Sequence, residues 1–380
     1  MKKKEIKLYY WCPVLSNVAT VKAVINSAIA TNRYSTDIKA TLIDTLSEWK
    51  SYNQQIYENK INIKKISSLE NFFPTRGIFM RLNYLKIFLS TFFPLLKLIR
   101  NEKPDYLVVH LITSLPILLK VIFNFDTKII LRISGFPKLN LFRKILWKIA
   151  SNKISIITSP TEGTFEYLKK NKIFDHNKIY LLRDPVISIN KINKLKKVNI
   201  SDNFLRKPFI LVIGRLSNQK NQKLILQNFQ NKEFEKYNLI ILGEGELERK
   251  IKSLVSKMSL DERVMFVGYN ENVYKFLNKA KFLIISSLWE DPGWAMIEAA
   301  ACNTTVISSD CEHGPNEFLK NGEGGYLFTS NSDKGLISSI REYNLSSEYE
   351  IMRKKIFLKK QSNSYTLFKH FTKLRTILLG

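Results

Sequence analysis

Short, almost wholly apolar runs alternate with helical patterns along this chain, and that alternation constrains the fold more than any other feature. In the first half, the predicted strands are Ile6–Trp11, Tyr106–Val109, Lys128–Ile133, Ile154–Thr158 and Ile179–Leu182. In the second half, they are Phe209–Ile213, Leu239–Leu242, Val264–Val267, Phe282–Ser286 and Thr305–Ser308. Runs that are apolar on both faces are typical of strands inside a parallel sheet. Amphipathic patterns such as Asn221–Gln230 and Leu247–Ser259 separate them. The repeated alternation predicts an α/β protein with two doubly wound, Rossmann-like domains.

A lysine-rich segment, Ile187–Lys207, separates the two sets of strands and has no strong periodic pattern. We interpret it as an interdomain linker. The expected domains are therefore residues 1–190 and 200–363, each of ordinary domain size. The final segment, Ser364–Leu379, has a helical pattern, and we expect residues 364–380 to rejoin the first domain.

The net charge of +27 is unevenly distributed. Residues 1–200 hold 34 Lys and Arg against 13 Asp and Glu, whereas residues 201–380 hold 26 against 20. A strongly positive half favours anionic partners such as nucleic acid, anionic lipid or a lipid diphosphate. General Lys and Asn enrichment of the whole sequence is the alternative explanation, but it does not account for the asymmetry.

The cysteines and histidines show neither a disulfide framework nor a metal-ligand spacing. They are Cys12, Cys302, Cys311, His110, His176, His313 and His370. We therefore expect reduced thiols, a cytoplasmic location and no metal site. The most apolar stretch, Tyr84–Ile99, contains Lys86, Pro94 and Lys97 and falls short of the roughly 20 apolar residues of a membrane span.

The first candidate motif is Gly214-Arg215 with Lys220, on the turn after a predicted strand. Gly214 permits a sharp turn and close approach of a ligand. Ligands of open α/β sheets bind at the carboxyl ends of strands, where Arg215 and Lys220 are placed. Two cations at that edge suit a diphosphate. The alternative is a solvated basic loop.

Two weaker motifs follow the next strands. Gly243-Glu244-Gly245 is a glycine-rich turn before a helix, and we expect Gly245 to border a nucleotide. Val267 ends another strand and can offer backbone contacts to a base. Many strand–helix turns have this appearance, so neither motif is specific alone.

The strongest motif runs from Ser286 to Ala300. The residues Asp291-Pro292-Gly293 are typical of a turn, and a helix is predicted to begin after them at Trp294. Glu290 then lies on the loop and Glu298 about two turns into the helix. Their carboxylates can accept hydrogen bonds from sugar and ribose hydroxyls, and the helix N-terminus between them suits a phosphate. A capping turn with a solvated glutamate is the alternative.

These motifs together resemble the retaining glycosyltransferases of the GT-B fold, in the group 1 family (family 4) that includes glycogen-synthase-like and lipopolysaccharide enzymes. The resemblance covers about Phe209–Phe328. It rests on the Glu290–Glu298 spacing, on Gly214-Arg215 with Lys220, and on Gly314-Pro315-Asn316-Glu317 followed by Asn321-Gly322-Glu323-Gly324-Gly325.

The resemblance implies a role for each matching residue. Arg215 and Lys220 would hold the donor diphosphate, with Gly214, Gly245 and Val267 lining the nucleotide. Glu298 would bind the ribose, and Glu290 with the backbone amides of Gly293 and Trp294 would hold the sugar. The expected catalytic set is Glu290, His110, Arg215 and Lys220. The donor, expected to be a UDP-sugar, is a substrate, and neither cofactor nor metal is expected.

The N-terminal half matches the family less well. Pro104–His110 resembles a strand that ends in a sugar-contacting histidine, so His110 is a candidate to contact the donor sugar; a structural histidine is the alternative. The family's usual Gly-Gly loop is replaced by Pro13–Lys22. Its usual histidine-containing turn is replaced by Arg132–Pro137.

Two stretches in this half combine Lys and Arg with apolar residues, namely Met80–Arg100 and Leu139–Lys148. Such stretches can lie on an anionic bilayer, or they can pack on their own sheet with the cations in solvent. We therefore expect a cytoplasmic protein, peripheral on the inner face of the membrane if the first interpretation holds. The expected acceptor is a polyprenyl-diphosphate-linked glycan in bacterial surface polysaccharide synthesis (O-antigen or capsule).

Two other interpretations stay open from the sequence. One is a different GT-B enzyme, either a sugar phosphorylase or a nucleotide-sugar epimerase. The other is a non-catalytic polyanion-binding protein. We expect no nucleic-acid partner, because no arginine-rich tract or nucleic-acid module is recognisable.

Overall fold

The structure, a computed structural model, describes residues 5–14, 19–67, 77–137, 139–200 and 207–380, with side chains described from Leu82 onward in the third of these ranges. The chain divides into two compact units, one of Met1–Pro185 with Leu367–Gly380 and one of Val186–Thr366. Each unit is described by itself.

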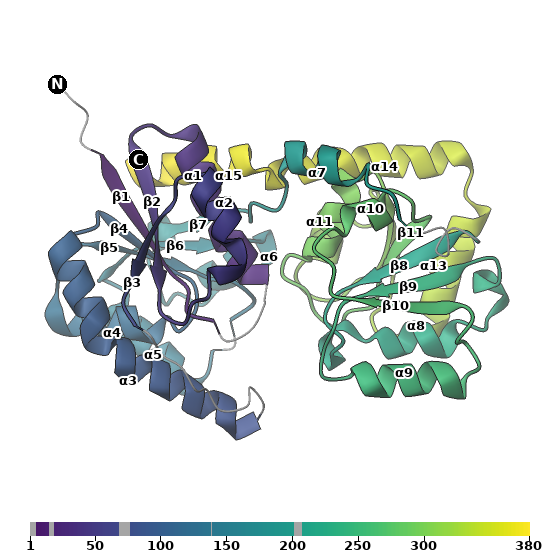
Figure 1. The fold of residues 1–380 in the computed structure, drawn as a ribbon, viewed down its shortest axis with the longest axis horizontal. Helices are drawn as coiled ribbons and strands as arrows, with labels where there is room; N and C mark the ends of the chain where they lie inside the picture. Colours follow the sequence, from purple (N-terminus) through teal and green to yellow (C-terminus); the bar gives the residue numbers. More distant parts are fainter. Residues whose placement is uncertain (1–4, 15–18, 68–76, 138, 201–206) are drawn as a thin grey trace. The chain divides into compact units, whose positions relative to one another are not determined.

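The first unit is built on a seven-stranded, wholly parallel sheet (Figure 1). Its strands are β1 (Ile6–Trp11), β2 (Ile38–Asp44), β3 (Asn62–Lys65), β4 (Tyr106–Val109), β5 (Lys128–Arg132), β6 (Ile154–Ser159) and β7 (Ile179–Leu181). Their order is β3-β2-β1-β4-β5-β6-β7. The order reverses between β1 and β4, which makes that pair the topological switch point of the unit.

Helices cover both faces of this sheet, because successive side chains of each strand point to opposite faces. Leu8 and Tyr10 of β1 pack in one core, and Tyr9 and Trp11 in the other. The first core is covered by α1 (Ala19–Tyr34), α2 (Asn53–Glu58) and α15 (Leu367–Leu379). The second is covered by α3 (Gly77–Glu102), α4 (Ser114–Phe123), α5 (Leu141–Ala150) and α6 (Glu162–Lys170).

The second unit repeats this plan with six parallel strands in the order β10-β9-β8-β11-β12-β13. The strands are β8 (Phe209–Ile213), β9 (Asn238–Leu242), β10 (Val264–Gly268), β11 (Phe282–Ile285), β12 (Thr305–Ser309) and β13 (Tyr326–Phe328). One face carries α8 (Gln222–Asn228), α9 (Glu248–Lys257) and α13 (Asp333–Leu345). The other carries α7 (Ile189–Leu195), α10 (Tyr274–Leu277), α11 (Trp294–Ala301), α12 (Pro315–Leu319) and α14 (Glu348–Ser362). The switch point lies between β8 and β11.

The fold class predicted from the sequence is confirmed. The expected linker is wrong in one respect, because Ile187–Lys207 begins with helix α7. Ile187, Ile192 and Ile200 of this segment pack in the core of the second unit. Their burial explains why the part up to Ile200 folds although its sequence pattern is weak.

The sequence predicted that no stretch is long and apolar enough to span a membrane. By length and composition, this prediction is also wrong. Among the described residues, one segment of α3, Leu82–Glu102, is long and apolar enough to cross a membrane, with a mean hydropathy of 1.4. Only 33% of its most apolar window is buried within the protein. Membrane-spanning segments and core helices both satisfy this criterion. The contacts that Leu82–Glu102 makes are therefore needed to interpret it.

Candidate functional site

The loops after β8 and β11 bring the predicted site residues of the second unit together at its switch point. The turn Gly214–Lys220 follows β8, and the loop from Ser286 to Gly293 follows β11. Main-chain and side-chain hydrogen bonds join them, since the Leu288 amide donates to the Gln219 carbonyl at 2.8 Å. Ligands of open α/β sheets bind at this kind of edge.

Lys220 and Glu290 form an ion pair at this edge. Glu290 is only 6% exposed, and its Oε1 also accepts a hydrogen bond of 2.6 Å from the Ser287 hydroxyl. The Ser286 hydroxyl holds the turn that carries the lysine, because it donates hydrogen bonds to the carbonyl oxygens of Lys220 and Asn221 at 2.9 and 3.0 Å. A buried carboxylate needs such partners. The pair is thus held rigidly, with the lysine more exposed than the carboxylate.

The glycines of this region are required by close packing. A Cβ on Gly214 would approach the Lys220 side chain to 3.3 Å, so this glycine leaves room for the lysine to lie across the turn. A Cβ on Gly243 would lie 2.0 Å from the Gly214 carbonyl oxygen, and one on Gly245 would lie 2.3 Å from that of Leu216. Gly245 therefore supports the Gly214–Leu216 turn from behind. This contact explains its position without a nucleotide.

Helix α11 begins directly after Gly293, whose φ of +89° lies in the left-handed region that favours glycine. The first amides of α11 point toward the loop that holds Glu290, as the first N–H groups of any helix point away from its body. Glu298, 7% exposed, accepts a hydrogen bond of 3.3 Å from the Tyr274 hydroxyl of α10. Burial, and then the Glu298 charge, raise the pKa of Tyr274 well above its usual range, so this phenol stays a donor.

The remaining predicted residues of this unit are placed differently. Arg215 is exposed, and no residue in the described part of the chain forms an ion pair with it. Val267 and Trp294 are half-buried and pack against the core of the unit. The structure thus brings Lys220 and Glu290 into contact and places Arg215 on the same turn, whereas Glu298 contacts Tyr274.

His110 lies at the switch point of the first unit, where β4 ends beside β1. Its amide donates to the Trp11 carbonyl at 3.0 Å, and its Nδ1 lies 3.2 Å from the Ser134 hydroxyl. Burial, and then the Arg132 charge, hold the pKa of His110 well below its usual range. Two residues further on, Ile112 has a φ of +46°, a strained conformation for a β-branched residue. Such strain is concentrated at binding sites.

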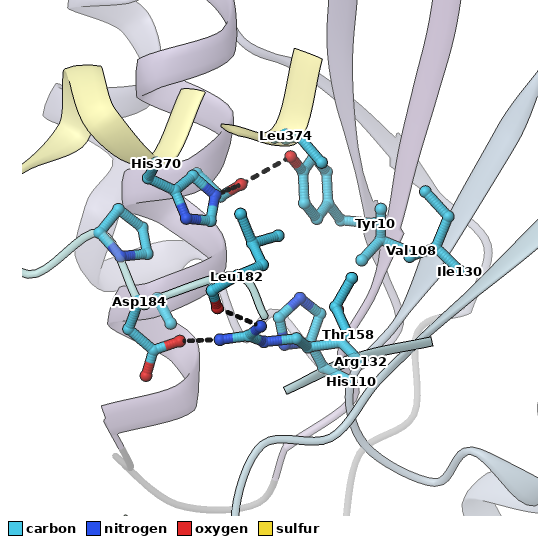
Figure 2. Close-up of a pocket in the computed structure, with 13 residues that line it drawn as sticks. Tyr10, Val108, His110, Ile130, Arg132, Thr158, Leu182, Asp184, His370 and Leu374 are labelled. Atoms are coloured by element: carbon cyan, nitrogen blue, oxygen red, sulfur yellow. Dashed lines mark hydrogen bonds and ion pairs between the residues drawn. The ribbon is translucent and has the colours of Figure 1, made fainter. Parts of the chain in front are cut away.

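His110 lines a small cavity inside the first unit (Figure 2). Arg132 reaches across it to the Leu182 carbonyl at 2.6 Å and to the Asp184 carboxylate. His370, from the C-terminal helix α15, lies 2.7 Å from the Arg183 carbonyl and 2.8 Å from the Ser27 hydroxyl. Arg132 stands in the segment that departs from the family pattern, and here it has a structural role.

Sequence reasoning missed this network and the two partners of the second-unit carboxylates, Ser287 and Tyr274. Ser287 lies within the strongest motif, Ser286 to Ala300, and could have been chosen from that position. Arg132, Asp184 and His370 are far apart in the sequence, so no local spacing links them. Of the N-terminal loop that replaces the Gly-Gly pattern, residues 15–18 lie outside the described part.

The chain has two Rossmann-like units, which is the architecture of GT-B-fold proteins. The second unit places a cationic turn, a carboxylate and a helix N-terminus at its switch point. Solved structures agree: HepE of Anabaena in complex with UDP-glucose matches 98% of this chain and 99% of its own, with a TM-score of 0.72 at 14% identity. The sequence profile of the family described as glycosyl transferases group 1 matches residues 193–356. The matched residues lie within the second unit.

Two relatives are similar in sequence. An uncharacterized glycosyltransferase, MJ1059, of Methanocaldococcus jannaschii is 33% identical over 248 residues, which are 60% of this chain and 61% of that protein. The N-acetylgalactosamine-N,N'-diacetylbacillosaminyl-diphospho-undecaprenol 4-alpha-N-acetylgalactosaminyltransferase of Campylobacter jejuni is 26% identical over 202 residues, 53% of this chain and 54% of that protein. The matched part thus spans less than two thirds of either relative.

Proposed function

We propose that this protein is a glycosyltransferase that transfers a sugar from a nucleoside diphosphate, with retention of configuration, to a lipid-linked glycan. The observation that carries the proposal is the Lys220–Glu290 pair at the switch point of the second unit, beside the exposed Arg215. A diphosphate needs cations, a sugar needs a hydrogen-bond acceptor, and this loop pair presents both.

The proposed chemistry follows from these charges. Breaking the bond between sugar and diphosphate builds negative charge on the leaving group and positive charge on the sugar. Arg215, Lys220 and the N-terminus of α11 stabilise the leaving diphosphate as that charge develops. Glu290 accepts hydrogen bonds from the donor sugar. Glu298 accepts them from the ribose, with Tyr274 orienting its carboxylate. His110 is the candidate contact to the donor sugar from the first unit.

The donor and acceptor classes rest on the relatives. HepE was solved with UDP-glucose, which favours a UDP-sugar as donor here. The Campylobacter enzyme is named for transfer to a diphospho-undecaprenol-linked sugar, which favours a polyprenyl-diphosphate-linked acceptor. These relatives support a role in surface polysaccharide synthesis, such as O-antigen or capsule. A location on the cytoplasmic side of the membrane is part of the proposal.

The experiment begins with a panel of sugar nucleotides, scored by the rise in melting temperature that a bound ligand gives by mass action. The stabilising donor is then used for turnover. Lys220→Ala and Arg215→Ala are each expected to lower turnover at least about tenfold, or about 1.4 kcal/mol of barrier. Lys223→Ala is the matched control, an exposed lysine on α8 three residues further on.

Unchanged turnover in both Lys220→Ala and Arg215→Ala would remove the diphosphate assignment. Product analysis separates the proposal from its rivals. A transferase releases the nucleoside diphosphate only when acceptor is present. A phosphorylase instead forms a sugar phosphate from inorganic phosphate, and an epimerase returns an altered sugar nucleotide.

A further inference from the structure

The outer surface of the first unit carries apolar side chains on two helices that lie on the same side of its sheet. On α3, Leu85, Leu89 and Phe93 are four residues apart and form one exposed stripe, in which Phe93 is 71% exposed. On α5, Leu141 and Phe142 are 75% and 71% exposed. Helix α4 packs against both α3 and α5, so the two belong to one surface (Figure 1). We call the outward sides of α3 and α5 the docking face.

Helix α5 shows most clearly that this face is not part of the core. Only Trp147 and Ala150 of this helix are buried, whereas Ile145 and Ile149 are exposed along with Leu141. Asn140 caps the helix by accepting a hydrogen bond of 2.8 Å from the Arg143 amide. A capped helix that turns most of its apolar residues outward requires a partner, because such patches on soluble surfaces mark interaction sites.

The charge of the docking face identifies the kind of partner. Helices α3, α4 and α5 contain eight Lys and Arg and one acidic residue, Glu102, which forms an ion pair with Lys64. Lys97, Arg100, Lys144 and Lys148 are exposed beside the apolar stripes. A second copy of this chain would bring like charges together, which opposes self-association. An anionic lipid surface offers both an apolar layer and complementary charge.

A groove at the C-terminal part of α3 supports the same partner. Phe93, Pro94, Lys97 and Arg100 line it, so that an apolar wall and two cations meet. Arg100 is held in place above the Phe123 ring of α4, with 5.2 Å between the guanidinium carbon and the ring centroid. Basic side chains beside inserted apolar residues are suited to the phosphates of lipid headgroups.

The inner side of α3 decides between spanning the bilayer and lying on it. Ile87, Leu95, Leu96 and Ile99 are buried in the core of the first unit. Crossing a membrane would remove these side chains from their sheet, and the large loss of packing rules out a span. A helix with one side in a protein core and an apolar outer side can instead lie in the interfacial plane.

We propose that the docking face binds the surface of an anionic bilayer, with α3 and α5 lying in its plane. The proposal deepens the function proposed above, because a membrane-held protein meets a lipid-linked acceptor in two dimensions. It rests on that function only for its biological purpose; the binding itself depends on the docking face alone.

The test measures co-sedimentation of the full chain with vesicles. Binding is expected to vesicles of equal parts phosphatidylcholine and phosphatidylglycerol, to weaken at high salt, and to be weak with phosphatidylcholine alone. Leu141→Ser with Phe142→Ser, and separately Lys144→Glu with Lys148→Glu, should each reduce binding roughly tenfold or more. Alkaline carbonate should release the protein from cell membranes, as it does surface-bound proteins.

Matched control variants come from the second unit. Leu345→Ser with Tyr349→Ser replaces two equally exposed apolar residues, and Lys250→Glu with Lys257→Glu reverses two exposed lysines on α9. Both controls should bind vesicles like the wild type. All variants should keep the melting temperature and its rise with a sugar nucleotide, which shows that they fold.

Three results would overturn the proposal. They are absence of wild-type binding to the anionic vesicles, equal binding by the α5 variants and the wild type, and retention in the membrane pellet after carbonate. Loss of self-association in the α5 variants, with vesicle binding unchanged, would assign the face to a protein partner instead. If the protein binds vesicles but no sugar nucleotide raises its melting temperature, the docking face is supported and the proposed function is contradicted.

Discussion

Lys220, the expected phosphate ligand, and Glu290, the expected sugar ligand, form an ion pair with each other. Each side chain therefore partly neutralises the charge of the other until a donor binds. A bound diphosphate would attract Lys220, and the donor sugar would then become a partner of Glu290. Both residues were found from the sequence because they stand in spaced motifs. Their mutual contact was not predicted, since 70 residues separate them.

Glu290→Gln should separate sugar recognition from phosphate recognition. The variant keeps an acceptor for Ser287 but loses the charge that holds Lys220. We expect a bare nucleoside diphosphate to bind at least as tightly as to the wild type, and the sugar nucleotide to bind several-fold more weakly. Calorimetric titration of both ligands measures this. Equal losses for the two ligands would contradict the assignment of Glu290 to the sugar.

His370 makes the stability of the first unit depend on pH. Burial is the main cause that lowers the pKa of His370 to about 4, from about 6.5 in the unfolded chain. Because the unfolded state binds the proton more readily, stability is present above about pH 6.5 and is lost as the pH falls toward about 4. Buried His110, whose pKa is also lowered, acts in the same direction.

The urea midpoint at pH 5 relative to pH 7 is the measurement for His370. We expect the wild type to lose stability at pH 5 and His370→Gln to lose less, although its midpoint at pH 7 is lower. His176→Gln, at an exposed position, should show the wild-type difference. A pH dependence that is identical in all three proteins would show that His370 does not carry it.

At the scale of elements, most strands could be predicted, the edge strands β7 and β10 among them, whereas the interior strand β2 and the edge strands β3 and β13 were missed. Strands β1, β4 and β8 begin and end where their apolar runs predict. The edge strand β3 was missed because it is short and exposes polar residues, and β13 because it has three residues. Strand β2 was missed although it is mostly buried, because Lys39 and Thr41 interrupt its apolar run. The sequence pattern thus detects uninterrupted apolar runs better than short or interrupted ones.

The strand–helix turns of the second unit depend on backbone packing that only glycine permits. Gly243→Ala places a Cβ 2.0 Å from the Gly214 carbonyl at a φ of +139°, so we expect a loss of roughly 2–4 kcal/mol in unfolding free energy. Gly135→Ala is the control, because no atom lies within 4 Å of its Cβ, and it should cost less than about 0.5 kcal/mol. Denaturant unfolding measures both, and similar stabilities would contradict the packing argument.

At the scale of the whole molecule, each unit has its own two cores, one on each face of its sheet. Each therefore has the material to unfold as a unit of its own. The site in the second unit could be predicted because its residues stand in spaced motifs within one segment. The cavity network of the first unit could not, because α15 brings His370 to it from the end of the chain.

Two unfolding transitions are expected in a calorimetric scan, and a nucleoside diphosphate should raise the transition of Val186–Thr366. At a hundredfold excess over the dissociation constant, the stabilisation is about 2.7 kcal/mol. Hydrogen exchange assigns the protected amides to a unit. Protection confined to the first unit would contradict the placement of the diphosphate.

The central claim is that Arg215 and Lys220 hold a diphosphate at the switch point of the second unit. Its most direct test is the affinity of the wild type, Lys220→Ala and Lys223→Ala for a nucleoside diphosphate and for the corresponding monophosphate. The account predicts that the wild type and Lys223→Ala prefer the diphosphate and that Lys220→Ala loses this preference. A preference that survives in Lys220→Ala would contradict it.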